Sequence, residues 1–133
     1  ADSVSAVLAP GEFLPAPGQG ALAVQTRADE DEINELVRGL DDESSRIAVE
    51  AERQVLRAVG GGCSVPLGVW ARIESGALRI NAMIAALDGK RLYRSSGSCD
   101  IGRRGECADR VAAELLSAGG GEILENIRSD AEK

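Results

Sequence analysis

The sequence predicts an α+β fold: a three-stranded antiparallel sheet with helices packed on one face, preceded by a strand and a helix left from an α/β domain. Three observations lead to this prediction. Apolar residues recur with helical spacing on both sides of the middle of the chain. Between them, residues 67–98 alternate apolar and polar. Turn signals at Ser75-Gly76 and Asp88-Gly89 divide that stretch into three strands.

Residues 1–41 are interpreted as the C-terminal remnant of the α/β domain, and residues 42–133 as a complete second domain. Residues 21–27 alternate in the manner of a strand. From Asp29 the spacing becomes helical, and Asp29 or Asp31 can cap the helix. Its apolar stripe is Ile33, Leu36, Val37 and Leu40. The chain opens at Ala1 without a methionine, which is consistent with a processed or excised piece.

The second domain is expected to read helix, meander, helix. Its first helix begins in the cluster Asp42 to Ser45 and runs to about Val59, with Glu50, Glu52, Arg53 and Arg57 on a solvated face. The apolar stripe of that helix is Ile47, Ala51, Val55 and Ala58. The third strand, Lys90 to about Ser98, is polar and suits a sheet edge.

Two more helices are expected after the sheet. The first carries Ala108, Val111, Ala112 and Leu115 and ends at the glycines 119–121, and a short one carries Ile123, Leu124 and Ile127. These helices share one face of the sheet, so the other face must be solvated or covered by something outside the chain.

Composition excludes several classes of function. The 15 basic and 22 acidic residues give a net charge of −7, which argues against a nucleic acid or an anionic membrane as the main partner. The chain has no histidine, so Ser–His and Cys–His nucleophile pairs and the commonest metal ligand are excluded. Three cysteines without CxxC spacing indicate neither a zinc site nor a disulfide framework. Without a long apolar run or a signal-peptide pattern, the sequence suggests a cytosolic protein.

Cys63 is the one plausible nucleophile, because it lies in the glycine-rich stretch Gly60 to Gly68 between a helix and a strand. The helix before it presents its negative end, which disfavours the thiolate. Cys63 therefore suits an attachment point that reacts once with an electrophile, although the local pattern alone slightly favours an inert buried thiol. Cys99 and Cys107 are interpreted as structural, and Arg103-Arg104 as a surface pair that could bind an anion.

Three motifs together resemble the C-terminal part of the porphobilinogen deaminase family, whose members are also called hydroxymethylbilane synthases. Leu14 to Ala21 (LPAPGQGA) is similar to that family's LPAxGQGA segment, and Gly61 to Gly68 (GGCSVPLG) is similar to its GGCxVPxG loop. Glu50 to Arg53 lies between them and is similar to the family's ER helix. The order of the three motifs also agrees.

The resemblance implies a role for each motif. The family's loop cysteine, here Cys63, forms a thioether to a dipyrromethane cofactor, on which four porphobilinogen molecules condense into the linear tetrapyrrole hydroxymethylbilane. Gln19, with Gly18 and Gly20, would contact pyrrole substrate or cofactor. The family's catalytic aspartate and the arginines that hold pyrrole carboxylates belong to segments absent here, so we expect this chain alone to be inactive. Surface once shared with those segments could drive self-association.

Two other classes remain open at this stage. Helix, meander, helix is also the element order of a double-stranded-RNA-binding domain, although the net charge weighs against it. The second is a structural or regulatory domain in which Cys63 is inert.

Overall fold

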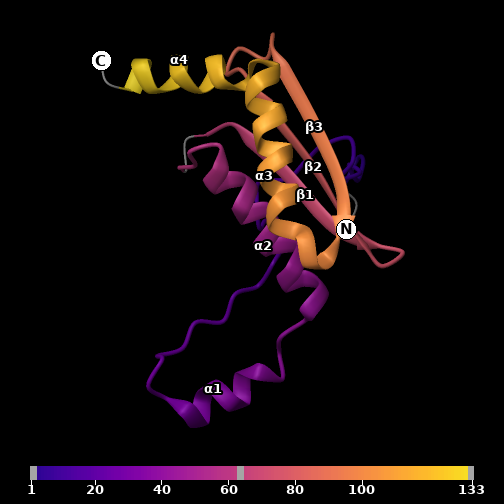
Figure 1. Cartoon of the computed structure of the whole chain (residues 1–133), viewed down its shortest axis with the longest axis vertical. Coiled ribbons are helices and arrows are strands. Elements are labelled where there is room, and N and C mark those ends of the chain that lie inside the picture. Colours follow the sequence, from indigo (N-terminus) through magenta and orange to yellow (C-terminus); the bar gives the residue numbers. More distant parts are fainter. Residues whose placement is uncertain (1–2, 63–64, 132–133) are drawn as a thin grey trace.

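The structure, a computed structural model, describes residues 3–62 and 65–131, without the side chains of residues 130 and 131. Its helices and strands are α1 (Asp31–Arg38), α2 (Glu43–Ala58), β1 (Leu67–Glu74), β2 (Ala77–Ala85), β3 (Leu92–Asp100), α3 (Arg104–Leu115) and α4 (Gly121–Ala131). Figure 1 shows the sheet beside α2 and α3, with α1 standing apart from them. The predicted α+β class, with a three-stranded antiparallel sheet and helices, is confirmed.

The sheet is a meander in the order β1-β2-β3. Ser75 and Gly76 join β1 to β2 with φ angles of 52° and 79°, the left-handed conformation of a tight hairpin turn. The second connection is longer, because Ala86 N donates to Arg91 O at 2.8 Å and closes a loop over residues 86–91. The third strand therefore begins at Leu92, two residues later than predicted, and it forms a sheet edge as expected.

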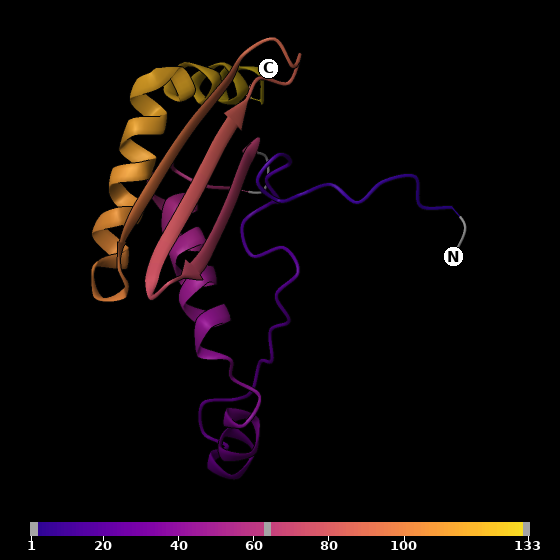
Figure 2. The same cartoon turned by 90° about the vertical axis from the view of Figure 1, so that its right-hand side faces the viewer.

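The core lies between the sheet and the helices α2 and α3, and Figure 2 shows these helices together on one side of the strands. Val69 and Ala82, which are register partners, and Ile80 point into it and are almost fully buried. The helices contribute Ile47, Ala51, Val55, Val59, Ala108, Val111, Ala112 and Leu115. Val59 takes the place predicted for Ala58, because buried positions of α2 recur every four residues from Ile47.

The opposite face of the sheet is partly covered by the chain's own N-terminal segment. Gly11 approaches the ring of Trp70, and Arg94 donates to Glu12 O at 3.3 Å. Leu14 is 4% exposed. The expectation that only solvent or something outside the chain covers this face is therefore wrong over residues 11–15.

The predicted strand over residues 21–27 is also wrong, since the structure assigns no strand there. Leu22 is fully exposed at 100%, so the alternating side chains find no partner strand and no face to bury. The helix that follows does form, as α1, but its N-cap is Glu30 and has no side-chain capping bond. Leu36 and Leu40 are more than 70% exposed, so the apolar face of α1 contacts no core.

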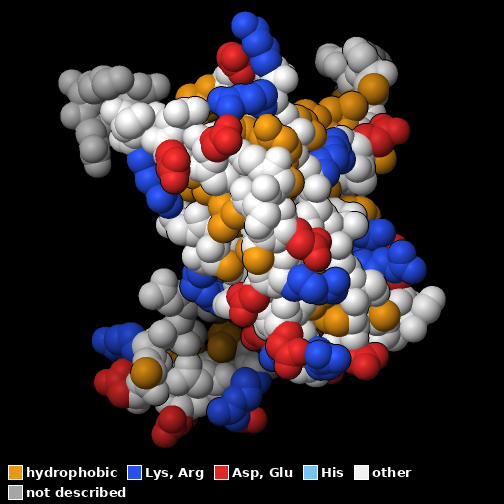
Figure 3. All heavy atoms as spheres, turned by 45° about the horizontal axis from the view of Figure 1, so that its top comes forward, with side chains coloured by type: hydrophobic (Ala, Val, Ile, Leu, Met, Phe, Trp, Pro, Cys, Tyr) orange, Lys and Arg blue, Asp and Glu red, His pale blue; other side chains and the backbone are white. Residues whose placement is uncertain are grey.

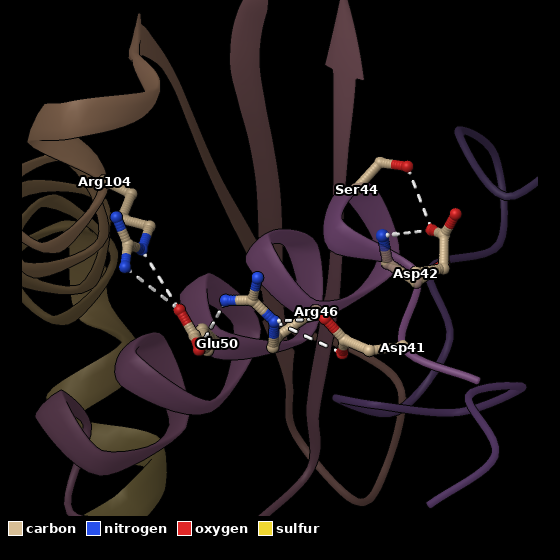
Figure 4. Close-up of polar contacts among 7 residues, drawn as sticks. Asp41, Asp42, Ser44, Arg46, Glu50 and Arg104 are labelled. Atoms are coloured by element: carbon tan, nitrogen blue, oxygen red, sulfur yellow. Dashed lines mark hydrogen bonds and ion pairs between the residues drawn. The ribbon is translucent and has the colours of Figure 1, made fainter. Parts of the chain in front are cut away.

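Polar contacts fix the start of α2 and link it to α3 (Figure 4). The Asp42 carboxylate accepts from Ser45 N at 2.8 Å and from the Ser44 hydroxyl at 2.9 Å, as the predicted capping cluster requires. Glu50, about two helical turns after Asp42, forms an ion pair with Arg104 at 3.1 Å. Asp42 thus begins the helix that leads to the glycine-rich loop, and the ion pair joins it to α3.

Candidate functional site

The segment that carries the GQG motif is docked on the edge of β1. Pro15 O accepts from Val69 N at 2.8 Å, which extends the hydrogen bonding of the sheet by one bond. The Leu14 side chain lies over Gly68, where an added Cβ would be 2.9 Å from Leu14 Cβ and 3.0 Å from Leu14 O. Gly68 therefore permits a close approach that any other residue would obstruct. Two motifs that are 40 residues or more apart in sequence contact each other here.

Glu52, in the third motif, bonds both the GQG motif and β1, the strand that begins within the cysteine-loop motif. Its carboxylate accepts from Gly18 N at 2.6 Å and from Ala71 N at 2.8 Å, so one side chain of α2 holds both the GQG segment and the edge of β1. Glu52 is only 6% exposed. Burial raises the pKa of its carboxyl, and the backbone bonds from Ala71 and Gly18 oppose that rise.

The position of Glu52 overturns the sequence interpretation, which placed it on a solvated helix face. That interpretation rested on the charged neighbours of Glu52, two of which, Arg53 and Arg57, are indeed exposed. The partners of Glu52 are backbone amides of segments 34 and 19 residues away, which helical periodicity does not reveal. The signal that could have found it is the family resemblance of Glu50 to Arg53.

The three predicted residues of the GQG motif lie in one turn. Gln19 is exposed, and its side-chain oxygen accepts from Ala16 N at 3.0 Å. Gly18 and Gly20 have φ angles of 76° and 87°, which glycine adopts without strain. At Gly20 an added Cβ would meet no atom within 4 Å. The turn thus presents Gln19 and an open backbone surface, while Gly18 is tied to Glu52.

The glycine-rich loop begins directly after α2. Gly60 has a φ of 81°, and Gly61 N donates to Leu56 O at 2.9 Å, so these two residues end the helix. Val65 N donates to Gly62 O at 3.2 Å. Cys63, the predicted attachment point, lies outside the described residues, so the loop is known up to Gly62 and again from Val65.

The surroundings of Gly62 and Gly60 differ. An added Cβ at Gly62 would meet no atom of the described residues within 4 Å. At Gly60 the Arg128 guanidinium is close, and its Nη2 donates to Gly60 O at 3.4 Å. Among the described residues, the loop therefore has free space beside Gly62 and a cation beside Gly60.

The remaining candidate residues lie at or near the N-terminal end of α3. Arg103 forms an ion pair with Glu106 at 2.6 Å, and Arg104 bonds Glu50, so both arginines have carboxylate partners. Cys107 is buried, and Cys99 is partly exposed. Among the residues that the structure describes, no group of three or more metal-ligating side chains comes together.

The surface shows no strong separation of charge on the face drawn in Figure 3, where acidic and basic side chains alternate with exposed apolar ones. In the described part of the chain, no helix is both long enough and apolar enough to cross a membrane.

Comparison with known proteins shows the family to which the chain belongs. A family described as "Porphobilinogen deaminase, C-terminal domain" matches residues 46–117, more than half of the chain. The chain therefore belongs to the family of the C-terminal domain of porphobilinogen deaminase.

Full-length relatives extend the similarity over nearly the whole chain. The porphobilinogen deaminase of Syntrophobacter fumaroxidans is 41% identical over 124 residues, which are 93% of the chain and 40% of that relative. Those of Desulforudis audaxviator and Pelotomaculum thermopropionicum are 44% and 40% identical, over 89% and 97% of the chain. These matches cover 38% and 41% of the two relatives. The chain thus spans about two fifths of the length of the curated relatives it matches.

Proposed function

We propose that this chain is the C-terminal part of a porphobilinogen deaminase, in which Cys63 carries a dipyrromethane cofactor through a thioether. In the whole protein this cofactor, when bound, primes the condensation of four porphobilinogen molecules into hydroxymethylbilane with loss of ammonia. The family match over residues 46–117, which includes Cys63, is the observation that carries the proposal. The division at residue 41, into a remnant of the second domain and a cofactor-attachment domain, is part of the same proposal.

The described residues around the loop suit such a group. A dipyrromethane with its carboxylate side chains needs space next to its attachment point and cations nearby. The open side of Gly62 offers the space, and the Arg128 guanidinium at Gly60 offers positive charge. A thioether needs a thiol at this position, which Cys63 supplies.

The contacts of Glu52 support a positioning role for the GQG turn. Glu52 fixes Gly18 against α2, the helix that ends in the glycine-rich loop. The turn that presents Gln19, Gly18 and Gly20 is therefore held in a constant position relative to that loop. In this proposal Gln19 contacts the pyrrole groups of substrate or cofactor.

We further propose that the chain by itself does not form hydroxymethylbilane. Its relatives are more than twice as long, and the catalytic aspartate is expected in the part that this chain does not match. The exposed side chains Leu22, Leu36 and Leu40 suit contacts with that missing part, or self-association when it is absent. Steady hydroxymethylbilane formation by the purified 133-residue chain would contradict this proposal.

The attachment can be tested by mass spectrometry of the full-length protein that contains this sequence. The expected result is an adduct with the mass of a dipyrromethane on the tryptic peptide that contains Cys63. A matched Cys99→Ser variant should keep the adduct, and a Cys63→Ser variant should lose it. An unmodified Cys63 in active full-length protein would refute the attachment.

A further inference from the structure

Two thiols that the proposed function does not use lie together at the far end of the sheet. Cys99, on β3, and Cys107, at the end of the first turn of α3, both line a surface cavity of about 490 Å³. The Cys107 thiol is one of the groups that raise the pKa of Cys99, to about 11, after burial. The two cysteines therefore face the same cavity of the folded chain, although eight residues separate them in sequence.

Gly97 makes this proximity possible. It faces α3 from β3, and an added Cβ would be 2.8 Å from Val111 and 3.0 Å from Cys107 Sγ. The lack of a side chain lets the helix approach the strand more closely than a larger residue would permit. The Cys107 sulfur is thereby brought down to the strand that carries Cys99.

The cavity gives access to the side of Cys107 that faces Arg110. Arg110 Nη2 lies 3.7 Å from Cys107 Sγ, and both residues line the cavity. Asp100, Arg103 and Glu106 complete the lining, so the charges of the cavity balance. At neutral pH the Cys99 thiol keeps its proton, and it reacts second.

We propose that Cys99 and Cys107 form a thiol–disulfide exchange site, which a low-molecular-weight disulfide such as oxidised glutathione converts into an intramolecular disulfide. The Cys107 thiol loses its proton to solvent as its sulfur attacks one sulfur of the small disulfide, whose S–S bond breaks and releases one thiol. The Cys99 thiol then loses its proton to solvent and attacks the Cys107 sulfur, which releases the second thiol. Two protein thiols and one small disulfide thus give one protein disulfide and two small thiols.

The test is peptide mapping after equilibration with glutathione buffers of graded composition and alkylation of the remaining thiols. Trypsin cleaves after Arg94, Arg103 and Arg110, so Cys99 and Cys107 fall on separate peptides, and Cys63 on a third. The expected product is a linked pair of the first two peptides, two hydrogens lighter than their sum. Cys99→Ser should instead accumulate glutathione on Cys107, and Cys107→Ser should react more slowly.

A control in urea distinguishes disulfide formation that depends on the folded structure from disulfide formation between thiols that are merely close in sequence. If the folded structure brings the thiols together, the ratio of disulfide to dithiol at a given glutathione composition should be at least about tenfold higher in native than in unfolded protein. An equal ratio in both states would overturn the proposal. Recovery of both cysteines as alkylated thiols, or of glutathione on Cys99 alone in the native protein, would also overturn it.

Discussion

Replacement of Glu52 by alanine tests the contact that holds the GQG motif and β1 to α2. The change removes the acceptor of two backbone amides, Gly18 N and Ala71 N. Because both donors belong to segments distant in sequence, the variant should loosen the docking of the GQG segment on β1. The structure also predicts a lower free energy of unfolding.

The size of that loss follows from the burial of each donor. The bond to Ala71 N is buried, and leaving a buried donor without an acceptor costs about 1–3 kcal/mol. The bond to Gly18 N is only part-buried, so water can replace the carboxylate there at a cost below about 1 kcal/mol. Because burying the Glu52 carboxylate is itself unfavourable, removing it recovers part of the free energy lost at Ala71 N and at Gly18 N. We therefore expect a net loss of about 1–3 kcal/mol.

The stability that Glu52 contributes should also depend on pH. Burial raises the pKa of the Glu52 carboxyl above its ordinary value of 4.5. A group whose pKa is higher in the folded than in the unfolded protein contributes its full stability at a pH below the unfolded-state pKa. That stability is lost as the pH rises through the folded-state pKa. The advantage of wild type over Glu52→Gln should thus be largest below pH 4.5 and decrease above it.

Urea unfolding and limited proteolysis measure these effects. Glu50→Ala is the matched control, because Glu50 lies on the same helix and its ion pair with Arg104 is exposed to solvent. That exposed pair contributes about 0–1 kcal/mol. Cleavage after Arg27 should become faster in Glu52→Ala and remain unchanged in Glu50→Ala. Equal stability of the two variants, with equal cleavage rates, would refute the role assigned to Glu52.

Two further substitutions test the fold around the site. Gly68→Ala places a Cβ 2.9 Å from Leu14, so it should lower the free energy of unfolding by about 1–3 kcal/mol, whereas Gly102→Ala, with open space around it, should not. A Gly68→Ala variant as stable as Gly102→Ala would contradict that packing. Asp42→Ala should lower the urea midpoint at pH 7, because the Ser45 backbone bond lowers the pKa of the Asp42 carboxyl. A carboxyl whose pKa is lowered in the folded state contributes its full stability only above its ordinary pKa, which is 3.8 for Asp42. The difference in urea midpoint between wild type and Asp42→Ala should therefore shrink below pH 3.8. A difference that does not change with pH would contradict the capping role of Asp42.

The sheet and its helices could be predicted because their signals are local. Alternation in β1 and β2, the glycine of each hairpin, and the stripes of α2 and α3 each fall within a window of a few residues. Asp42 could be assigned as a cap for the same reason, since its partner lies three residues away.

The errors arise where the partner lies far along the chain or outside it. Residues 21–27 carry the pattern of a strand, yet no described strand pairs with them. Glutamate is usually found on the surface, and only the hydrogen bonds from Gly18 N and Ala71 N explain why Glu52 is buried. The proximity of Cys99 and Cys107 depends on the packing of α3 on β3, which eight residues of spacing do not encode.

Hydroxymethylbilane formation by full-length protein with Cys63→Ser, compared with Cys107→Ser, is the most direct test of cofactor attachment at Cys63. Cys63→Ser should lose both the dipyrromethane adduct and the activity, because the primer then has no attachment point. Cys107→Ser, which changes a thiol outside the proposed site, should retain both. Full activity of the Cys63→Ser protein would contradict the account.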